Sequence, residues 1–409
     1  LTSNTTADDN SAFGVSALRE NTTGTANASF GRAALQNNTT ANNNSAFGYN
    51  ALKLNTTADN NTAVGKSALG ANTTGHSNVA VGSETLLLNS TGSNNTAVGY
   101  LALTKTSEDE NTAVGAYALR ENLTGEYNTA VGYECLTKNT TADNNSAFGY
   151  FALHQNTTGA QNTAVGRKAL QNNTTANDNA AFGNSSLETN TTGSNNTAVG
   201  SGALLNNTTG SENTAVGQAS LNSHTTGLDN SALGRSSGYD LTSGENNLLL
   251  GHDAGRSSSP SGSITTGNNN VVLGNNAISN LFCADTSISS SDSRDKTDVA
   301  SFNIGLAWIE ALRPVTYRWD RRTWYGTEKE PFGTPDGSKK RDRLHIGFLA
   351  QEALAVEKAN GYGTSNDDSL ICNLTDDGMS YGMKYERLVP ILVNAIKELS
   401  TKVTALEAG

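Results

Sequence analysis

Apolar and polar positions repeat every seventeen residues along the first two thirds of the chain. Each unit reads Asn-Thr/Ser-Ala-Val/Phe-Gly-x-x-Ala-Leu-x-x-Asn-Thr-Thr, and its strand-like part is seen at Asn162–Gly166 and Asn196–Gly200. A unit this short cannot bury its own apolar face and has to stack on its neighbours. The pattern predicts a mainly β fold, a parallel β-roll or solenoid of about sixteen coils and roughly 75 Å in length.

One glycine in each unit marks the period. A coil shorter by one residue follows Gly99, and an insertion of six residues precedes Gly274. Glycine permits positive φ and asparagine tolerates it, so both should turn the chain, and the recurring asparagines should form ladders between coils. The glycines are Gly14, Gly31, Gly48, Gly65, Gly82, Gly99, Gly115, Gly132, Gly149, Gly166, Gly183, Gly200, Gly217, Gly234, Gly251 and Gly274.

Side chains should alternate across each strand, with Thr and Val or Phe on one face and Ala on the other. We expect the face of Phe47 and Val64 to form the core, together with the Leu four residues after each glycine, such as Leu52. The column of Ala63 and its equivalents would then point outward. A small apolar column on the outside needs cover, which predicts three rods packed side by side as a homotrimer.

Charge and cysteine content exclude several classes of function. Before residue 281 the chain has 11 basic and 19 acidic residues, so no basic face is expected for nucleic acid. Cys135, Cys283 and Cys372 are odd in number and far apart, which predicts small buried side chains without a disulfide or metal site. No cofactor is expected. No apolar run has the length of a membrane span, and no signal peptide precedes Leu1, although a chain beginning with Leu leaves a processed or truncated N-terminus open.

Many of the Asn-Thr-Thr triplets satisfy the N-glycosylation sequon. We interpret them as turns, because an array repeats whatever its turn requires and sequon density then follows from the period. These asparagines include Asn4, Asn21, Asn38, Asn55, Asn72, Asn139 and Asn156.

The period stops after Gly274, which predicts a division into a solenoid at 1–283 and an α+β domain at 284–409. Four motifs follow one another in the second part: Ser291–Lys296, Ile309–Trp319, His345–Glu352 and Tyr385–Leu392. In this order they resemble the endosialidase-type intramolecular chaperone domain of viral tail spikes and fibres. The repeat itself resembles the left-handed β-roll heads of trimeric autotransporter adhesins and the repeats of phage tail fibres.

The resemblance to the chaperone family implies a domain that templates trimer assembly and then severs itself. It places the nucleophile at Ser291, the base at Lys296 and the cleaved bond between Ser291 and Asp292. A buried lysine can act as a base when its pKa is depressed. Because a serine that attacks its own carbonyl would close a strained ring, either the Ser of another chain acts or the attacked carbonyl is that of Ser290.

Two further residues bear on this site. Asp295 stands where the family usually has an aliphatic residue, and a carboxylate beside Lys296 would stabilise the charged lysine and oppose its role as base. His345 lies in a matching motif and is a candidate supporting residue, although a histidine at the start of a strand is more often structural. The implied activity is at most a single-turnover serine peptidase without an external substrate.

The last residues of the chain carry a heptad pattern. Its apolar positions are spaced four, three, four and three, which predicts a short coiled-coil helix that helps three chains to associate. These positions are Leu392, Ile396, Leu399, Val403 and Leu406.

The leading functional hypothesis is a trimeric viral tail fibre in the virion. It would bind a host receptor, a glycan or a surface protein, and would join upstream tail or fibre proteins. The alternative is a cellular surface adhesin or extracellular fibre built from the same modules. A polysaccharide depolymerase would require paired carboxylates in a groove, and the acidic residues of the repeats scatter without marking a pair.

Overall fold

The computed structural model describes residues 2–278, 299–326, 330, 332–365, 368–374 and 381–408. The chain divides into two compact units, Leu1–Asn280 and Leu281–Gly409, and each is considered by itself.

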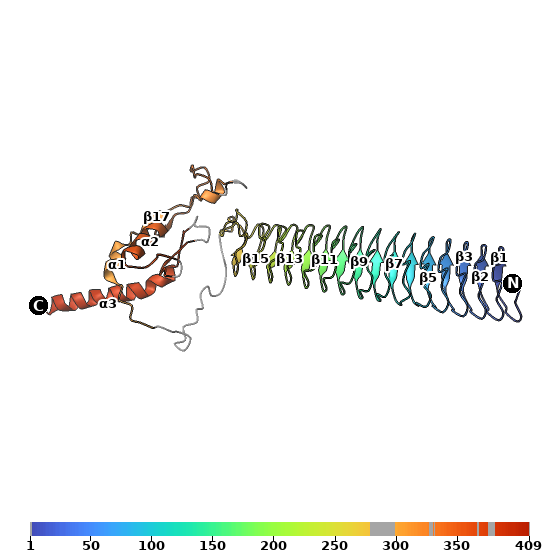
Figure 1. Ribbon diagram of the computed structural model, residues 1–409. Helices are drawn as coiled ribbons and strands as arrows, with labels where there is room; N and C mark the ends of the chain where they lie inside the picture. Colours follow the sequence, from blue (N-terminus) through green and yellow to red (C-terminus); the bar gives the residue numbers. More distant parts are fainter. Residues whose placement is uncertain are drawn as a thin grey trace. The chain divides into compact units, whose positions relative to one another are not determined.

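The first unit is a β-solenoid in which sixteen short parallel strands form a single sheet in chain order (Figure 1). This confirms the predicted architecture of stacked coils. The strands are β1 (Ser11–Phe13), β2 (Ala28–Phe30), β3 (Ser45–Phe47), β4 (Thr62–Val64), β5 (Val79–Val81), β6 (Thr96–Val98), β7 (Thr112–Val114), β8 (Thr129–Val131), β9 (Ser146–Phe148), β10 (Thr163–Val165), β11 (Ala180–Phe182), β12 (Thr197–Val199), β13 (Thr214–Val216), β14 (Ser231–Leu233), β15 (Leu248–Leu250) and β16 (Val271–Leu273).

Strand register is constant even where the coil length changes. In the shorter coil Thr96 of β6 still pairs with Thr112 of β7, and across the insertion Leu248 of β15 pairs with Val271 of β16. The difference in length is therefore absorbed by the turns.

The orientation of the strands is opposite to our expectation. The central alanine of the strand points into the coil and is fully buried, as for Ala63, whereas the flanking Phe47 remains 40% exposed. The Val/Phe column thus faces outward and the Ala column belongs to the core. Beside the strand the interior already holds a leucine column and two asparagine columns, so only a small side chain fits there.

The leucine column of the core is placed as predicted. Leu52, Leu69 and their equivalents are fully buried, and they hold positive φ angles, 48° for Leu52 and 50° for Leu69. A left-handed backbone is costly for such a residue. The coil tolerates it because the turned backbone carries the leucine side chain into the interior.

Two ladders of buried asparagines connect the coils, which confirms the predicted side-chain stacking. In the first, Nδ2 of Asn38 donates to Oδ1 of Asn21 in the preceding coil at 2.8 Å and to the carbonyl oxygen of Ala41. In the second, the backbone N–H of Asn44 donates to Oδ1 of Asn27 at 3.0 Å. Buried amides whose hydrogen bonds are satisfied fix the register between coils. The sequon residues Asn21 and Asn38 are buried in this ladder, consistent with their interpretation as turn residues.

The repeated glycine is required where successive coils approach most closely. Gly166 has φ +136°, and a Cβ atom there would lie 2.4 Å from the carbonyl oxygen of Gly183 in the next coil. No side chain fits at that distance, which explains why this position never varies along the array.

In its described residues, the second unit contains short strands and three α-helices. Its apolar core brings together Trp308, Leu312, Ala353, Ile371, Cys372, Leu388 and Ile391. The elements are α1 (Leu306–Ala311), β17 (Val315–Tyr317), η2 (Arg322–Trp324), β18 (His345–Gly347), α2 (Ala350–Ala359), β19 (Cys372–Leu374), β20 (Tyr381–Met383), η3 (Tyr385–Arg387) and α3 (Leu388–Glu407).

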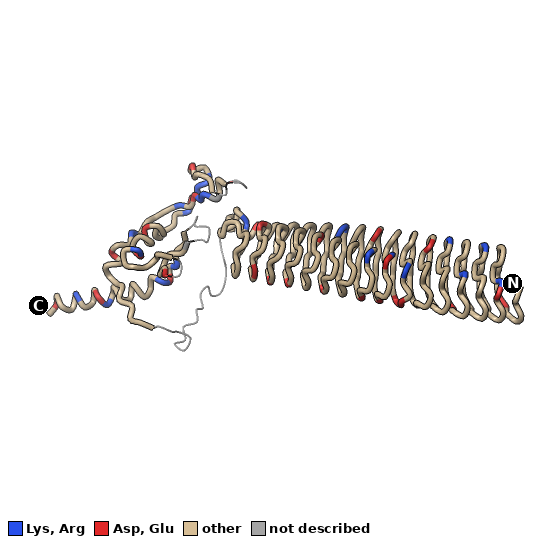
Figure 2. Tube along the Cα trace, viewed as in Figure 1, with Lys and Arg blue, Asp and Glu red and all other residues tan. Residues whose placement is uncertain are grey.

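Charged residues of the solenoid occupy the turns, with both signs interspersed (Figure 2). Its strands contain only small, hydroxylated or apolar residues. Within the described ranges, no helix combines the length and apolar character needed to cross a membrane.

Candidate functional site

The proposed self-cleavage residues fall almost entirely outside the described part of the chain. Ser291, Asp292, Asp295 and Lys296 are not among the described residues, and neither is Cys283. His345 is the one member of the predicted site that is described.

His345 lies at the start of β18, opposite Tyr317 of β17 in an antiparallel pair. Its ring stacks on that of Tyr317 with the centroids 5.5 Å apart, and it meets the Trp319 ring edge-on at 6.3 Å. Aromatic packing of this kind orients an imidazole. The position is compatible with a structural role, and whether it also supports Lys296 stays a prediction.

The long C-terminal helix α3 is amphipathic. Leu388, Ile391 and Ala395 face the core of the unit, while the predicted heptad positions lie on its exposed side, with Ile396 66% exposed. The helix thus presents an uncovered apolar seam.

The inner side of α3 is anchored to the chain around α1. Nδ2 of Asn394 donates to the carbonyl oxygens of Phe302 and Ile304, at 2.6 and 3.2 Å. The backbone N–H of Leu306 donates to a carboxylate oxygen of Glu398 at 3.1 Å. These contacts fix which side of the helix remains free.

A buried carboxylate organises the segment between α2 and β19. Glu357 is fully buried and accepts hydrogen bonds from the Ser369 hydroxyl at 2.8 Å and the Cys372 backbone N–H at 3.0 Å, as well as from the Ile371 backbone N–H. The thiol of Cys372 is buried beside this carboxylate, and burial raises its pKa to about 12. Cys135 likewise has its pKa raised to about 12 by burial inside the solenoid. Neither thiol has the thiolate character of a nucleophile.

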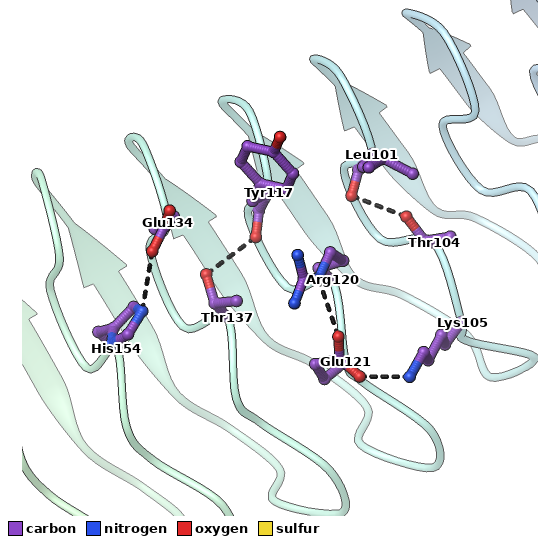
Figure 3. Close-up of polar contacts among 9 residues, drawn as sticks. All are labelled: Leu101, Thr104, Lys105, Tyr117, Arg120, Glu121, Glu134, Thr137 and His154. Atoms are coloured by element: carbon purple, nitrogen blue, oxygen red, sulfur yellow. Dashed lines mark hydrogen bonds and ion pairs between the residues drawn. The ribbon is translucent and has the colours of Figure 1, made fainter.

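The solenoid carries a cluster of polar and charged side chains that was not predicted from the sequence. Polar side chains of successive coils contact one another on the turns that follow β6 to β9 (Figure 3). Glu121 forms ion pairs with Arg120 at 2.8 Å and with Lys105, and the hydrogen bond from Lys105 lowers the pKa of Glu121. In the following coils Glu134 accepts from Nε2 of His154 at 3.0 Å.

Aromatic rings lie beside these charges. The Arg120 guanidinium sits over the Tyr117 ring, 5.4 Å from its centroid, and the ring of His154 packs on that of Phe151 at 4.7 Å. A hydrogen bond with Glu134 raises the pKa of Tyr133. Aligning the repeats and asking where aromatic residues replace polar ones would have found this cluster in the sequence.

Comparison with known proteins connects the second unit to one family. Residues 291–362 match the family described as the chaperone of endosialidase. The match includes the positions of Ser291, Asp292, Lys296 and His345, and it ends before the motif Tyr385–Leu392. No curated protein and no solved structure shows significant similarity to the chain. The chain therefore consists of a parallel β-solenoid followed by a region similar to the chaperone of endosialidase.

Proposed function

We propose that the chain is part of a homotrimeric viral tail fibre whose C-terminal region acts as an intramolecular chaperone. The observation that carries this proposal is the match of residues 291–362 to the chaperone of endosialidase, immediately after an elongated β-solenoid. The solenoid would reach the host surface and bind a receptor there, while the C-terminal region would bring three chains into register.

Two exposed apolar surfaces support association of the chains. One is the heptad seam of α3. The other is the Val/Phe column of the strand face, where Phe30 and Phe47 stack with ring centroids 5.0 Å apart. The second surface replaces the alanine column as the reason to expect partners, since the alanines are inside the coils.

Self-release would follow from the predicted dyad of Ser291 and Lys296. The hydroxyl oxygen of the serine would attack a backbone carbonyl carbon and its proton would pass to the neutral amine of the lysine. The peptide C–N bond would then break as the lysine ammonium passes that proton to the leaving amine nitrogen, and water would hydrolyse the ester that remains. Release after assembly would leave the mature fibre without its chaperone.

The test combines the intact mass and the sedimentation of the purified full chain. We expect about three chains per particle and a released fragment, which begins at Asp292 if another chain attacks the Ser291 carbonyl and at Ser291 if the Ser290 carbonyl is attacked. Ser291→Ala and Lys296→Ala should each abolish release while leaving trimers intact. The matched control is Ser293→Ala, which should cleave normally. A stable monomer would contradict the assembly proposal, and continued cleavage in Ser291→Ala would remove the dyad.

The chaperone role has a separate test. Deleting residues 281–409 before expression should leave the repeats aggregated, because stacking of parallel strands is slow and exposes strand edges. If the truncated chain yields a soluble trimer with the thermal stability of the full fibre, the C-terminal region is not a required chaperone.

A further inference from the structure

Six aromatic side chains of the middle coils form a continuous cluster on the surface of the solenoid. Tyr117 contacts Tyr100 and Tyr133 edge-on, with ring centroids 5.4 and 6.0 Å away. Tyr133 stacks on Tyr150 at 5.7 Å, and Tyr150 lies 4.1 Å from Phe151. The aromatic cluster consists of Tyr100, Tyr117, Tyr133, Tyr150, Phe151 and His154.

Three of these rings are open to solvent. Tyr100, Tyr133 and Tyr150 are 47%, 43% and 44% exposed. They occupy the same place in their coils, directly after the repeated glycine. Tyr133 and Tyr150 lie in adjacent coils, whereas Tyr100 lies two coils before Tyr133, because the coil between them has Ala116 at this place. The ring of Tyr117, the next residue, contacts both Tyr100 and Tyr133 across that coil. The result is a row of exposed rings parallel to the long axis of the solenoid.

The repeat does not need these rings. The position after the glycine is Tyr49, Lys66 or Ser83 in coils before the cluster and Arg167, Ser201 or Gln218 in coils after it, and these coils share the same strand and core. A feature that the fold required would recur in every coil. The cluster also begins at the one coil shortened by a residue, so two departures from the repeat coincide.

Charged groups that can form directed hydrogen bonds border the rings. The guanidinium of Arg120 lies over Tyr117, and the carboxylate of Glu134 binds His154 beside Phe151. Nδ1 of His154 is buried with no hydrogen-bond partner among the described residues. Exposed rings bordered by carboxylate and guanidinium groups provide stacking surfaces and hydrogen-bond partners at the same place.

We infer that the aromatic cluster is a binding surface for an extended, neutral polysaccharide lying along the solenoid. Pyranose rings place their C–H faces on aromatic rings and their hydroxyls on carboxylate and guanidinium groups. Their spacing along an extended chain is of the same order as the strand spacing of about 4.8 Å. The excess of acidic over basic residues in this unit, 19 against 11, opposes anionic polymers. The inference rests on the proposed attachment function and specifies its ligand class.

A second copy of the chain is the competing occupant. The strand face offers that partner a longer apolar column, running from Phe13 to Leu273 with Val and Phe in most coils. The aromatic cluster is confined to a few coils and is bordered by charges, which suits a polar ligand better than a repeated subunit contact.

The test measures binding of the full chain to immobilised glucan, mannan, galactan and xylan, with polysialic acid as the anionic probe. The variant replaces Tyr100, Tyr133 and Tyr150 by Ser, a residue that the array already accepts at this position in Ser83 and Ser201. Tyr49→Ser is the matched control, since Tyr49 has the same position in a coil outside the cluster.

We expect at least one neutral polysaccharide to bind, the triple variant to lose binding by about tenfold or more, and the control to bind as the parent does. Absence of binding to every neutral probe, or unchanged binding by the triple variant, would overturn the inference. A changed oligomeric state of the triple variant would instead assign the cluster to a subunit contact. Oligomeric state and cleavage are measured independently of sugar binding. A failure of the proposed fibre function can therefore be distinguished from a failure of the polysaccharide inference.

Discussion

His224 occupies the place, one coil after Asn207, at which an asparagine would donate to the Oδ1 atom of Asn207. Nε2 of His224 bonds the carbonyl oxygen of Gly227 at 3.0 Å, as the ladder asparagines bond their own turns. Oδ1 of Asn207 is buried and has no hydrogen-bond partner among the described residues. The amide ladder is therefore interrupted between these two coils.

The variant His224→Asn should restore the ladder. It supplies the missing donor to Asn207 and should raise the stability of the solenoid by about 1 kcal/mol, or a few degrees in Tm. Asn190→His, which creates the same interruption in an intact stretch, should lower Tm. Thermal unfolding followed by circular dichroism measures both. Equal Tm values for parent and His224→Asn would show that the interruption of the amide ladder does not lower the stability of the solenoid.

The buried His224 also predicts that the stability of the solenoid depends on pH. Burial lowers the pKa of His224 below its ordinary value of 6.5, so the unfolded chain takes up the proton first on acidification. The contribution of neutral His224 to the free energy of unfolding is complete above about pH 6.5. It is lost as the pH falls from there through the lowered pKa. His224→Asn should lose less Tm than the parent between neutral and mildly acidic pH. An identical loss in both chains would contradict this explanation.

Two glycines of the array should respond differently to alanine. Gly166→Ala places a Cβ against the backbone of Gly183 and requires φ near +136°, so we expect destabilisation of about 3 kcal/mol. Gly202→Ala should be tolerated, because its φ of +67° is held by alanine at Ala33 and Ala219 in the equivalent position. Tm values measure the contrast, and similar losses for both variants would refute the argument from close approach.

The exposed seam of α3 should control assembly rather than folding of the C-terminal unit. Ile396→Asp with Leu399→Asp introduces two charges into the proposed helix interface and should convert trimers to monomers. Lys397→Asp, exposed but outside the heptad positions, is the control. Sedimentation reports the number of chains, and circular dichroism should show unchanged secondary structure. A trimeric double variant would exclude the seam as an assembly element.

Glu357 should be needed for the stability of the C-terminal unit. Glu357→Gln leaves one acceptor oxygen where the carboxylate had two, and its amide N–H₂ then faces N–H donors of Ile371 and Cys372. We expect a loss of about 2 kcal/mol. Denaturant unfolding of the full chain should show this loss in the transition of this unit alone. Glu386→Gln, which changes an exposed carboxylate, should have no effect.

The predicted base can be tested through its neighbour. Because the carboxylate of Asp295 should favour protonated Lys296, Asp295→Leu should accelerate self-cleavage at neutral pH. Raising the pH should accelerate the parent more than the variant, since only the parent starts with a stabilised ammonium. Fragment release followed over time measures both rates. Equal rates and equal pH profiles in a parent that cleaves readily would exclude control by Asp295.

The sequence predicted the period, the strands, the buried leucines and the amide ladders, because each follows from local spacing. It did not predict which strand face is inside. Alternation states that Ala63 and Val64 point to opposite faces, but the width of the coil interior decides which face is buried.

The restriction of the central strand position to a small residue would have indicated that this position is the buried one. The central strand position is alanine in most coils, while the next position varies between Val, Phe and Leu. The aromatic cluster was missed for the converse reason, since it consists of residues that differ from the repeat. The geometry of the dyad depends on residues 291–296, which lie outside the described part of the chain.

The constancy of strand register across coils of sixteen, seventeen and twenty-three residues has an evolutionary consequence. Unequal recombination between the near-identical repeats of such a gene would add, delete or exchange whole coils without disturbing the pairing on either side. Each event would shift a surface turn and its side chains by one strand spacing, about 4.8 Å. The distance between recognition elements on this array can therefore change in small, fixed steps while the fold stays the same.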